Sequence, residues 1–201
     1  MNETFGRELL IRFCNLLYDR NLTASAGGNM SMMIGDSEIL MTPSGRNKGL
    51  LEPEDLVLIG TDGTVISGGK PSIESNIHLA LYNLNNDIKA VVHCHPLYCT
   101  SIAVKNKRLK TEMTPEGVLL LGKVPMIPYC TPGSQELVDA VAAHHESKAM
   151  IMARHGALTQ GKTIEEAYNR MEELEFQAKL QIVSGRTTGL PPWEVDKLNR
   201  M

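Results

Sequence analysis

The chain lacks the marks of several protein classes. Only four cysteines occur among its 201 residues, too few and too scattered for the disulfide framework of a small secreted domain. No apolar stretch approaches the roughly 20 residues that a membrane-spanning helix needs. Lysine and arginine form no basic run, and the formal net charge is −3, so neither nucleic acid nor an anionic membrane is expected as a partner.

A secretion signal is also missing from the first twenty residues. After Glu3 they carry five more charges in an amphipathic pattern, at Arg7, Glu8, Arg12, Asp19 and Arg20. A signal peptide would instead have a basic start followed by an apolar middle. We therefore expect a cytoplasmic protein with free thiols.

What the sequence does contain is the composition of a folded domain. Apolar residues make up 42% and charged residues 21%. A chain of this length can bury roughly 70% of the surface that its unfolded form would expose. We find no internal repeat, low-complexity segment or linker, so we expect one domain over residues 1–201, with 186–201 as a C-terminal tail.

Hydrophobic periodicity predicts an alternation of helices and short strands. Helices are expected over 4–20, from about 72 onward, and over 97–105, 133–145 and 164–183. Strands are expected at 30–33, 38–41, 56–59, 88–92, 124–127 and 148–152. Regular structure is expected to end at Gly189-Leu190-Pro191-Pro192. The pattern predicts one α/β domain, a mostly antiparallel central sheet with helices on its faces.

Two histidines follow the strand predicted at 88–92. His93 and His95 are two residues apart, so their side chains should project to one face while Cys94 points to the other. Two imidazoles directed the same way form half of a metal site. The motif alone is more often one packed and one solvent-facing histidine, and both interpretations stay open.

A third histidine follows the other buried strand, at 148–152. His155 is succeeded by Gly156, which allows the backbone to turn sharply. If the two strands lie close together in one sheet, three imidazoles converge, and three ligands with an open position describe a catalytic zinc site. The alternative is that His155 hydrogen-bonds to backbone in a turn.

Glu74 is the candidate general base. It is expected in the first turn of the helix beginning near Ser72, where a carboxylate is also favoured simply by the helix dipole. Beside three histidines, it could bind the metal at rest and then act as a base when substrate displaces it. His78, one turn further, is expected in the core or behind the site.

Three turns are candidates for binding a phosphate. Ala26-Gly27-Gly28-Asn29 and Thr42-Pro43-Ser44-Gly45 are rich in backbone N–H groups and small hydroxyls, and Ser72 stands at the predicted helix start. Each is a common turn on its own. Together they suggest a nest for a phosphate.

These motifs, in this order and at this spacing, resemble the class II aldolase/adducin family over about residues 5–185. The resemblance implies an α/β/α sandwich around a predominantly antiparallel sheet. It also implies a homotetramer with active sites at subunit interfaces. The motifs that carry it are Ser25-Ala26-Gly27-Gly28-Asn29-Met30-Ser31, Met41-Thr42-Pro43-Ser44-Gly45, Lys70-Pro71-Ser72-Ile73-Glu74, Val92-His93-Cys94-His95 and Arg154-His155-Gly156.

The resemblance also implies roles for single residues. One Zn²⁺ per subunit, or another divalent transition metal, would be held by three histidines together with Glu74, which is also the catalytic acid/base. The substrate would be a small phosphorylated sugar. The implied metal ligands are His93, His95, His155 and Glu74, and the implied phosphate-binding residues are Gly28, Asn29, Ser44, Gly45 and Ser72.

The implied reaction is cleavage of a ketose 1-phosphate to dihydroxyacetone phosphate and a short aldehyde. Family members that epimerise a sugar phosphate carry aspartate at the place of Glu74, which favours an aldolase here. Two departures stand against the pattern. Ile73 replaces a second serine, and residues 112–116 lack the family's tyrosine, for which Glu116 is a candidate substitute.

Other functions remain open at this stage. A decarboxylase, epimerase or dehydratase would use the same metal and phosphate parts. A non-catalytic interaction module, as in the adducin head domain, would not need the histidines. A structural zinc site in an unrelated fold would predict unfolding on chelation.

Overall fold

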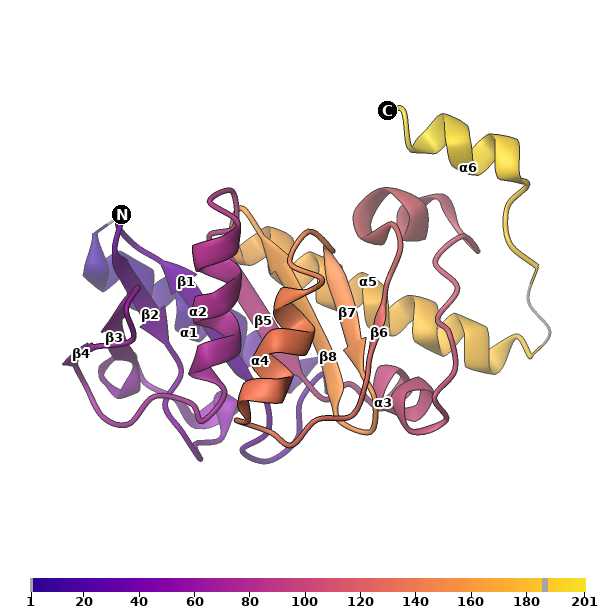
Figure 1. Cartoon of the computed structure of the whole chain (residues 1–201). Coiled ribbons are helices and arrows are strands. Elements are labelled where there is room, and N and C mark those ends of the chain that lie inside the picture. Colours follow the sequence, from indigo (N-terminus) through magenta and orange to yellow (C-terminus); the bar gives the residue numbers. More distant parts are fainter. Residues whose placement is uncertain (1, 186–187) are drawn as a thin grey trace.

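The central feature of the computed structural model, which describes residues 2–185 and 188–201, is a single sheet (Figure 1). Eight strands of the described chain lie in the order β4-β3-β2-β1-β5-β8-β7-β6, and all neighbours are antiparallel except β6 and β7. The strands are β1 (Asn29–Met33), β2 (Glu38–Met41), β3 (Val57–Gly60), β4 (Val65–Ser67), β5 (Ala90–Cys94), β6 (Met126–Ile127), β7 (Ala149–Met152) and β8 (Gly156–Gly161).

Helices cover both faces of the sheet. They are α1 (Glu3–Asp19), α2 (Ser75–Leu84), α3 (Leu97–Val104), α4 (Gln135–Ala142), α5 (Ile164–Val183) and α6 (Pro192–Leu198), with two short 3-10 helices, η1 (Lys48–Leu50) and η2 (Pro53–Asp55), and one π-helix, η3 (Gly117–Leu121). The apolar residues of α1, α3 and α5 form one core, and those of α2 and α4 form another on the opposite face. The predicted α/β/α sandwich is confirmed.

The strands other than β4 contribute to both cores because their side chains alternate. In β7, Ala149 and Ile151 lie in the first core, whereas Met150 and Met152 lie in the second. A strand buried on both faces reads as a continuous apolar run, as this segment does. This alternation also decides which residues at a strand end face the α2 side of the sheet.

Three predictions about the elements are wrong. Strands β4 and β8 were not expected. The helix near Ser72 begins only at Ser75, with Glu74 as its N-cap residue. Regular structure does not end at 189–192, because α6 begins at Pro192, where proline is well suited to a first helical position. Of the expected tail, residues 186–187 lie outside the described residues.

Strand β8 determines how the site is assembled. The strands followed by histidines, β5 and β7, are not neighbours, because β8 lies between them and pairs with both. The chain leaves β7, turns through His155 and re-enters the sheet beside β5, with Ala157 opposite Cys94. A Cβ atom on Gly156 would lie 2.5 Å from the Cys94 carbonyl oxygen and 2.5 Å from the His95 ring, so only glycine permits this approach.

The cysteines and the helices of the structure can be compared with what the composition predicts. All four cysteines are free thiols, three of them buried and Cys130 half-buried. None of the helices in the described segments combines the length and the apolar character that crossing a bilayer would require.

Candidate metal centre

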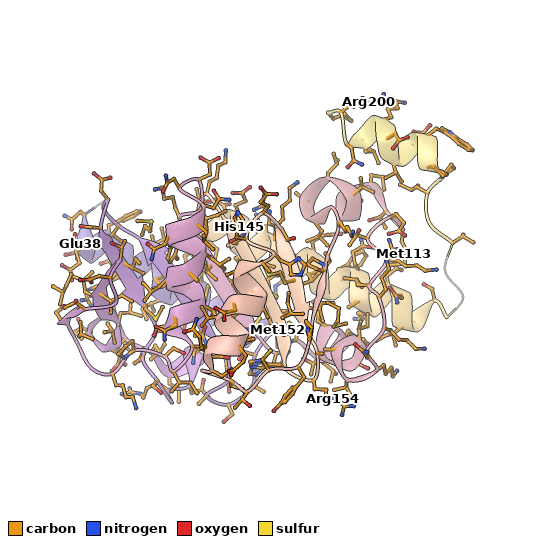
Figure 2. All side chains as sticks on the ribbon, in the orientation of Figure 1. Glu38, Met113, His145, Met152, Arg154 and Arg200 are labelled. Atoms are coloured by element: carbon orange, nitrogen blue, oxygen red, sulfur yellow. The ribbon has the colours of Figure 1, made fainter. Side chains whose placement is uncertain are left out.

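The structure brings the three predicted histidines together at one edge of the sheet. His93 lies on β5, His95 follows it directly, and His155 lies in the turn between β7 and β8. Their candidate ligand nitrogens all lie within 4.8 Å of one another. The ring centroids are 4.8–5.2 Å apart. Arg154 marks this edge in Figure 2, and Arg200 of the C-terminal segment lies far from it.

Glu74, the N-cap residue of α2, contacts the same cluster of histidines. Its Oε2 atom is 3.2 Å from Nε2 of His93, and its Oε1 atom is 3.4 Å from Nε2 of His155. Its backbone N–H donates to Oγ of Ser72 over 3.2 Å, which ties it to the segment before α2. The carboxylate is therefore held at the start of α2, facing the histidines.

The donor atoms fit a divalent transition metal. Nε2 of His93, Nε2 of His95 and Oε1 of Glu74 are buried without a hydrogen-bond partner among the described residues. Such atoms are rare in folded proteins, so several at one point indicate a site for a cation. Nδ1 of His93 donates to the Ala157 carbonyl over 2.8 Å, which leaves the Nε2 lone pair free for a metal. Imidazole and carboxylate ligands suit Zn²⁺ and other transition metals.

The charge state of the cluster also favours a cation. Burial, followed by the neighbouring imidazoles, lowers the pKa of His95 and of His155 to about 4, so both rings are neutral at pH 7. Burial raises the pKa of Glu74, but its contacts with His93, His155 and Asn29 outweigh that effect and set the pKa at about 2. An ionised carboxylate beside the neutral rings of His95 and His155 is a ready ligand set.

These pKa values predict that the metal-free protein loses stability in mild acid. Below the ordinary histidine pKa of about 6.5, the unfolded chain takes up protons that folded His95 and His155 refuse until about pH 4. The free energy of unfolding should therefore fall as pH falls from 6.5 toward 4, measured by urea denaturation. His95→Asn should make that fall shallower, and equal slopes for the two proteins would contradict the assignment.

The predicted phosphate residues lie on three turns that the structure ties together. The Ser44 N–H donates to the Lys70 carbonyl over 3.0 Å, and Pro43 and Pro71 form an isolated antiparallel β-bridge. The second turn therefore lies beside the Ser72 segment. Lys48 joins the first turn to the second, since its ammonium donates to the carbonyls of Ala26 at 3.1 Å and Arg46 at 2.8 Å. Sequence reasoning missed this lysine, which is 1% exposed.

One predicted phosphate residue already has another partner. The side-chain amide of Asn29 donates to Oε2 of Glu74 over 2.9 Å. The residue therefore links the first turn to the candidate base. Its role toward a phosphate stays a prediction, as do those of Gly28, Ser44, Gly45 and Ser72.

Two glycines of these turns should respond differently to alanine. Gly28 and Gly45 both have positive φ, 72° and 70°, so alanine costs each about 1–2 kcal/mol of backbone strain. A Cβ on Gly28 would also lie 2.6 Å from the His93 carbonyl oxygen, whereas one on Gly45 would meet nothing within 4 Å. Gly28→Ala should therefore lower the free energy of unfolding by about 1–3 kcal/mol more than Gly45→Ala, measured in urea. Equal losses would contradict the close approach.

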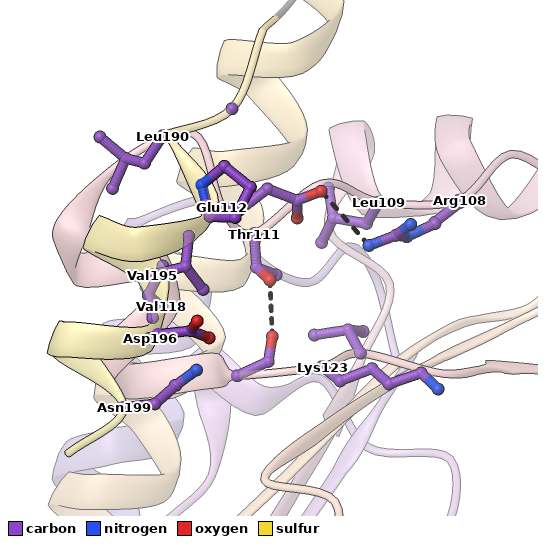
Figure 3. Close-up of a pocket in the computed structure, with 14 residues that line it drawn as sticks. Arg108, Leu109, Thr111, Glu112, Val118, Lys123, Leu190, Val195, Asp196 and Asn199 are labelled. Atoms are coloured by element: carbon purple, nitrogen blue, oxygen red, sulfur yellow. Dashed lines mark hydrogen bonds and ion pairs between the residues drawn. The ribbon is translucent and has the colours of Figure 1, made fainter.

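The segment around Glu116, from which a polar group at the aldehyde end of the substrate was expected, is not part of the histidine cluster. Glu116 precedes η3, which packs against α5 and α6, and its charge acts on Glu173 of α5. A cavity of about 510 Å³ lies between α6 and residues 108–124, lined by Arg108, Glu112, Lys123 and Asp196 among others (Figure 3). The histidines do not line it. Within one chain, Glu116 is therefore not part of the metal centre.

The architecture and the site define an α/β/α sandwich with a candidate metal centre of three histidines and a carboxylate at one sheet edge. The chain belongs to the class II aldolase and adducin family, because the model of the Class II Aldolase and Adducin N-terminal domain matches residues 8–182. This family membership confirms the resemblance inferred from the motifs, and it supports a lyase.

Relatives with two different reactions are similar to the chain. An L-fuculose phosphate aldolase of Methanococcus vannielii is 39% identical over 170 residues, which cover 85% of this chain and 92% of that protein. A 3-oxo-tetronate 4-phosphate decarboxylase of Escherichia coli K12 is 35% identical over 184 residues, covering 89% and 87%. Both are lyases, so the relatives support that class without deciding the bond that is cleaved.

Two solved structures are also similar to the chain. YgbL of Escherichia coli, described as a putative aldolase/epimerase/decarboxylase, superimposes with a TM-score of 0.94 at 33% identity, covering 98% of both chains. An L-fuculose 1-phosphate aldolase superimposes with a TM-score of 0.89 at 29% identity, covering 96% of this chain and 94% of that one. The fold extends over nearly the whole of each chain.

Proposed function

We propose that the protein is a Zn²⁺-dependent aldolase that cleaves a ketose 1-phosphate to dihydroxyacetone phosphate and a short aldehyde. L-Fuculose 1-phosphate or a similar deoxy sugar phosphate is the proposed substrate. The observation that carries the proposal is the Glu74 carboxylate, which lies 3.2 Å from His93 and 3.4 Å from His155 inside the histidine cluster. The aldolase relatives at 38–39% identity support the substrate class.

The chain's own residues divide the work between binding and proton transfer. His93, His95, His155 and, at rest, Glu74 would hold the cation, which when bound polarises the substrate carbonyl and stabilises developing negative charge. Glu74 would accept the proton lost from the hydroxyl of the carbon that becomes the aldehyde, and would return a proton to the carbon freed by C–C cleavage. The backbone N–H groups and hydroxyls of the three turns would anchor the phosphate beside it.

A decarboxylase of a 3-oxo-tetronate phosphate is the second candidate. Three observations favour it: the decarboxylase relative at 35% identity, the TM-score of 0.94 to YgbL, and the absence of tyrosine from residues 112–116. The same metal centre and phosphate turns would serve, with carbon dioxide as the leaving group. A non-catalytic module would have no use for three histidines and a carboxylate converging at one edge.

Product analysis decides between the two reactions. The zinc-loaded protein is supplied with L-fuculose 1-phosphate and, separately, with a 3-oxo-tetronate 4-phosphate, while dihydroxyacetone phosphate and carbon dioxide are both measured. Chelator-sensitive release of dihydroxyacetone phosphate from the first substrate supports the aldolase. Carbon dioxide from the second substrate alone would replace that proposal with the decarboxylase.

The assembly is part of the same proposal. We expect a homotetramer in the cytoplasm, with active sites at subunit interfaces. Several large apolar side chains are more than half exposed on the single chain, which is consistent with further contacts between copies; they include Leu97, Tyr129, Phe176, Val183 and Trp193. Light scattering of the purified protein measures the copy number directly.

A further inference from the structure

Three residues of α2 and its N-cap form a row that faces β1. Glu74, His78 and Tyr82 follow one another at intervals of four residues, which places them on one face of the helix. Asn29 and Ser31 alternate on β1 and point toward that face. The two repeats match, since four helical residues rise about 6 Å and two strand residues about 6.6 Å. The side chains of helix and strand can therefore interleave.

Hydrogen bonds connect the five side chains in one line. Tyr82 and Ser31 lie 2.6 Å apart through their hydroxyl oxygens, and Ser31 Oγ lies 2.7 Å from Nδ1 of His78. Nε2 of His78 lies 2.5 Å from Oδ1 of Asn29. Asn29 donates to Glu74 over 2.9 Å. All five residues are at most 5% exposed, so water does not compete for these bonds.

The direction of every bond follows from the carboxylate at one end. An ionised carboxylate only accepts, so the Asn29 NH₂ must face Glu74 and its Oδ1 must accept from His78. Burial lowers the pKa of His78 to about 3, so the ring is neutral and has a single N–H, which is at Nε2. Nδ1 is then an acceptor, and Ser31 donates to it while accepting from Tyr82.

We propose that His78, with Ser31 and Tyr82 behind it, is a positioning residue for the candidate base. The Nε2–H of His78 fixes the amide orientation of Asn29, and Asn29 in turn directs the carboxylate of Glu74 toward His93 and His155. If the amide turned over, its oxygen would face the carboxylate and repel it. The inference rests on the proposed function only in treating Glu74 as the group that moves a proton.

The tautomer of His78 is the most direct test, and it needs no substrate. Long-range ¹⁵N–¹H correlation spectra of the ¹⁵N-labelled, metal-free protein should show His78 protonated at Nε2 and unprotonated at Nδ1. Ser31→Ala removes the donor to Nδ1 and should produce a mixture of tautomers, whereas Ser31→Thr keeps a hydroxyl and should keep the Nε2–H form. An Nδ1–H tautomer in the unsubstituted protein would overturn the proposal.

Kinetics of His78 variants test the consequence for the site. His78→Leu should lower kcat by about 10–100-fold, the range for removing a group that orients a ligand or base. Zinc content should stay at the unsubstituted level, and KM should change by less than about threefold, since four of the five predicted phosphate residues, Gly28, Ser44, Gly45 and Ser72, are not in contact with His78. His78→Gln offers an amide N–H to Asn29 and should restore most of kcat. Tyr82→Phe, at the far end of the line, should have the smallest effect.

The outcomes separate this inference from the proposed function. An unchanged kcat in folded His78→Leu would overturn the positioning role, while loss of turnover in Glu74→Gln would still stand for the base. Full turnover in Glu74→Gln would instead refute the proposed function and leave the tautomer result valid. If His78→Leu does not fold, the tautomers of the unsubstituted and Ser31→Ala proteins decide.

Discussion

Replacing Glu74 by glutamine is expected to lower turnover by about 10²–10⁴-fold, the usual contribution of a positioned acid or base. Glutamine keeps the size of the side chain, but its amide can neither take up nor release a proton at neutral pH. The three histidines remain and the glutamine keeps a side-chain oxygen at the place of the carboxylate, so zinc content should stay near one ion per chain. The measurement is kcat for release of dihydroxyacetone phosphate together with metal analysis of the same sample.

A matched control separates the loss of this carboxylate from a general effect of removing charge. Glu165→Gln makes the same chemical change in the first turn of α5, where the side chain is not part of the metal centre. Its kcat should stay within about twofold of the unsubstituted protein. Glu74→Gln with full turnover and bound zinc would show that another group moves the proton.

Replacing His155 by alanine is expected to remove the metal and the activity together. Two imidazoles and a carboxylate would remain, which leaves zinc one protein ligand short of the present set. Removing a group that only supports a ligand already costs 10–100-fold in metal affinity, so loss of a ligand should cost at least about 100-fold. Metal content after dialysis and a competition titration with a chromophoric chelator measure this loss.

His144→Ala is the control for this substitution. His144 lies just after α4, half-buried and outside the histidine cluster, so its removal should leave metal content unchanged. Stoichiometric zinc in His155→Ala would place the ion elsewhere. Equal metal loss in both variants would point to destabilisation of the whole chain rather than to removal of a ligand.

Most of the layered fold could be predicted because local patterns specify it. The run at Leu56–Ile59 and the apolar segments before His93 and His155 read as strands and are strands. The resemblance implied the α/β/α sandwich, but the order of the strands in the sheet was not predicted, because local patterns do not contain it. Strand β8 was missed because Gly156-Ala157-Leu158-Thr159-Gln160-Gly161 begins and ends with glycine and has one β-branched residue. Its strand conformation comes from pairing on both sides.

The site shows the same division between what is local and what is not. The convergence of His93 and His155 was expected if their strands lay close together in one sheet. They do, but strand β8, which was not expected, lies between them and pairs with both. The pairing of Asn29 with Glu74 was not foreseen. The four-residue spacing of Glu74, His78 and Tyr82 was a signal in the sequence, but only contact with β1 gives it meaning.

The central claim is that the histidine cluster is a catalytic metal centre, and a metal titration tests it most directly. Chelator-stripped protein is titrated with Zn²⁺ while release of dihydroxyacetone phosphate from L-fuculose 1-phosphate is followed. We predict that activity rises linearly and stops at one ion per chain, and that His155→Ala shows no such break. Activity that is present without metal, or that never responds to it, would contradict the account.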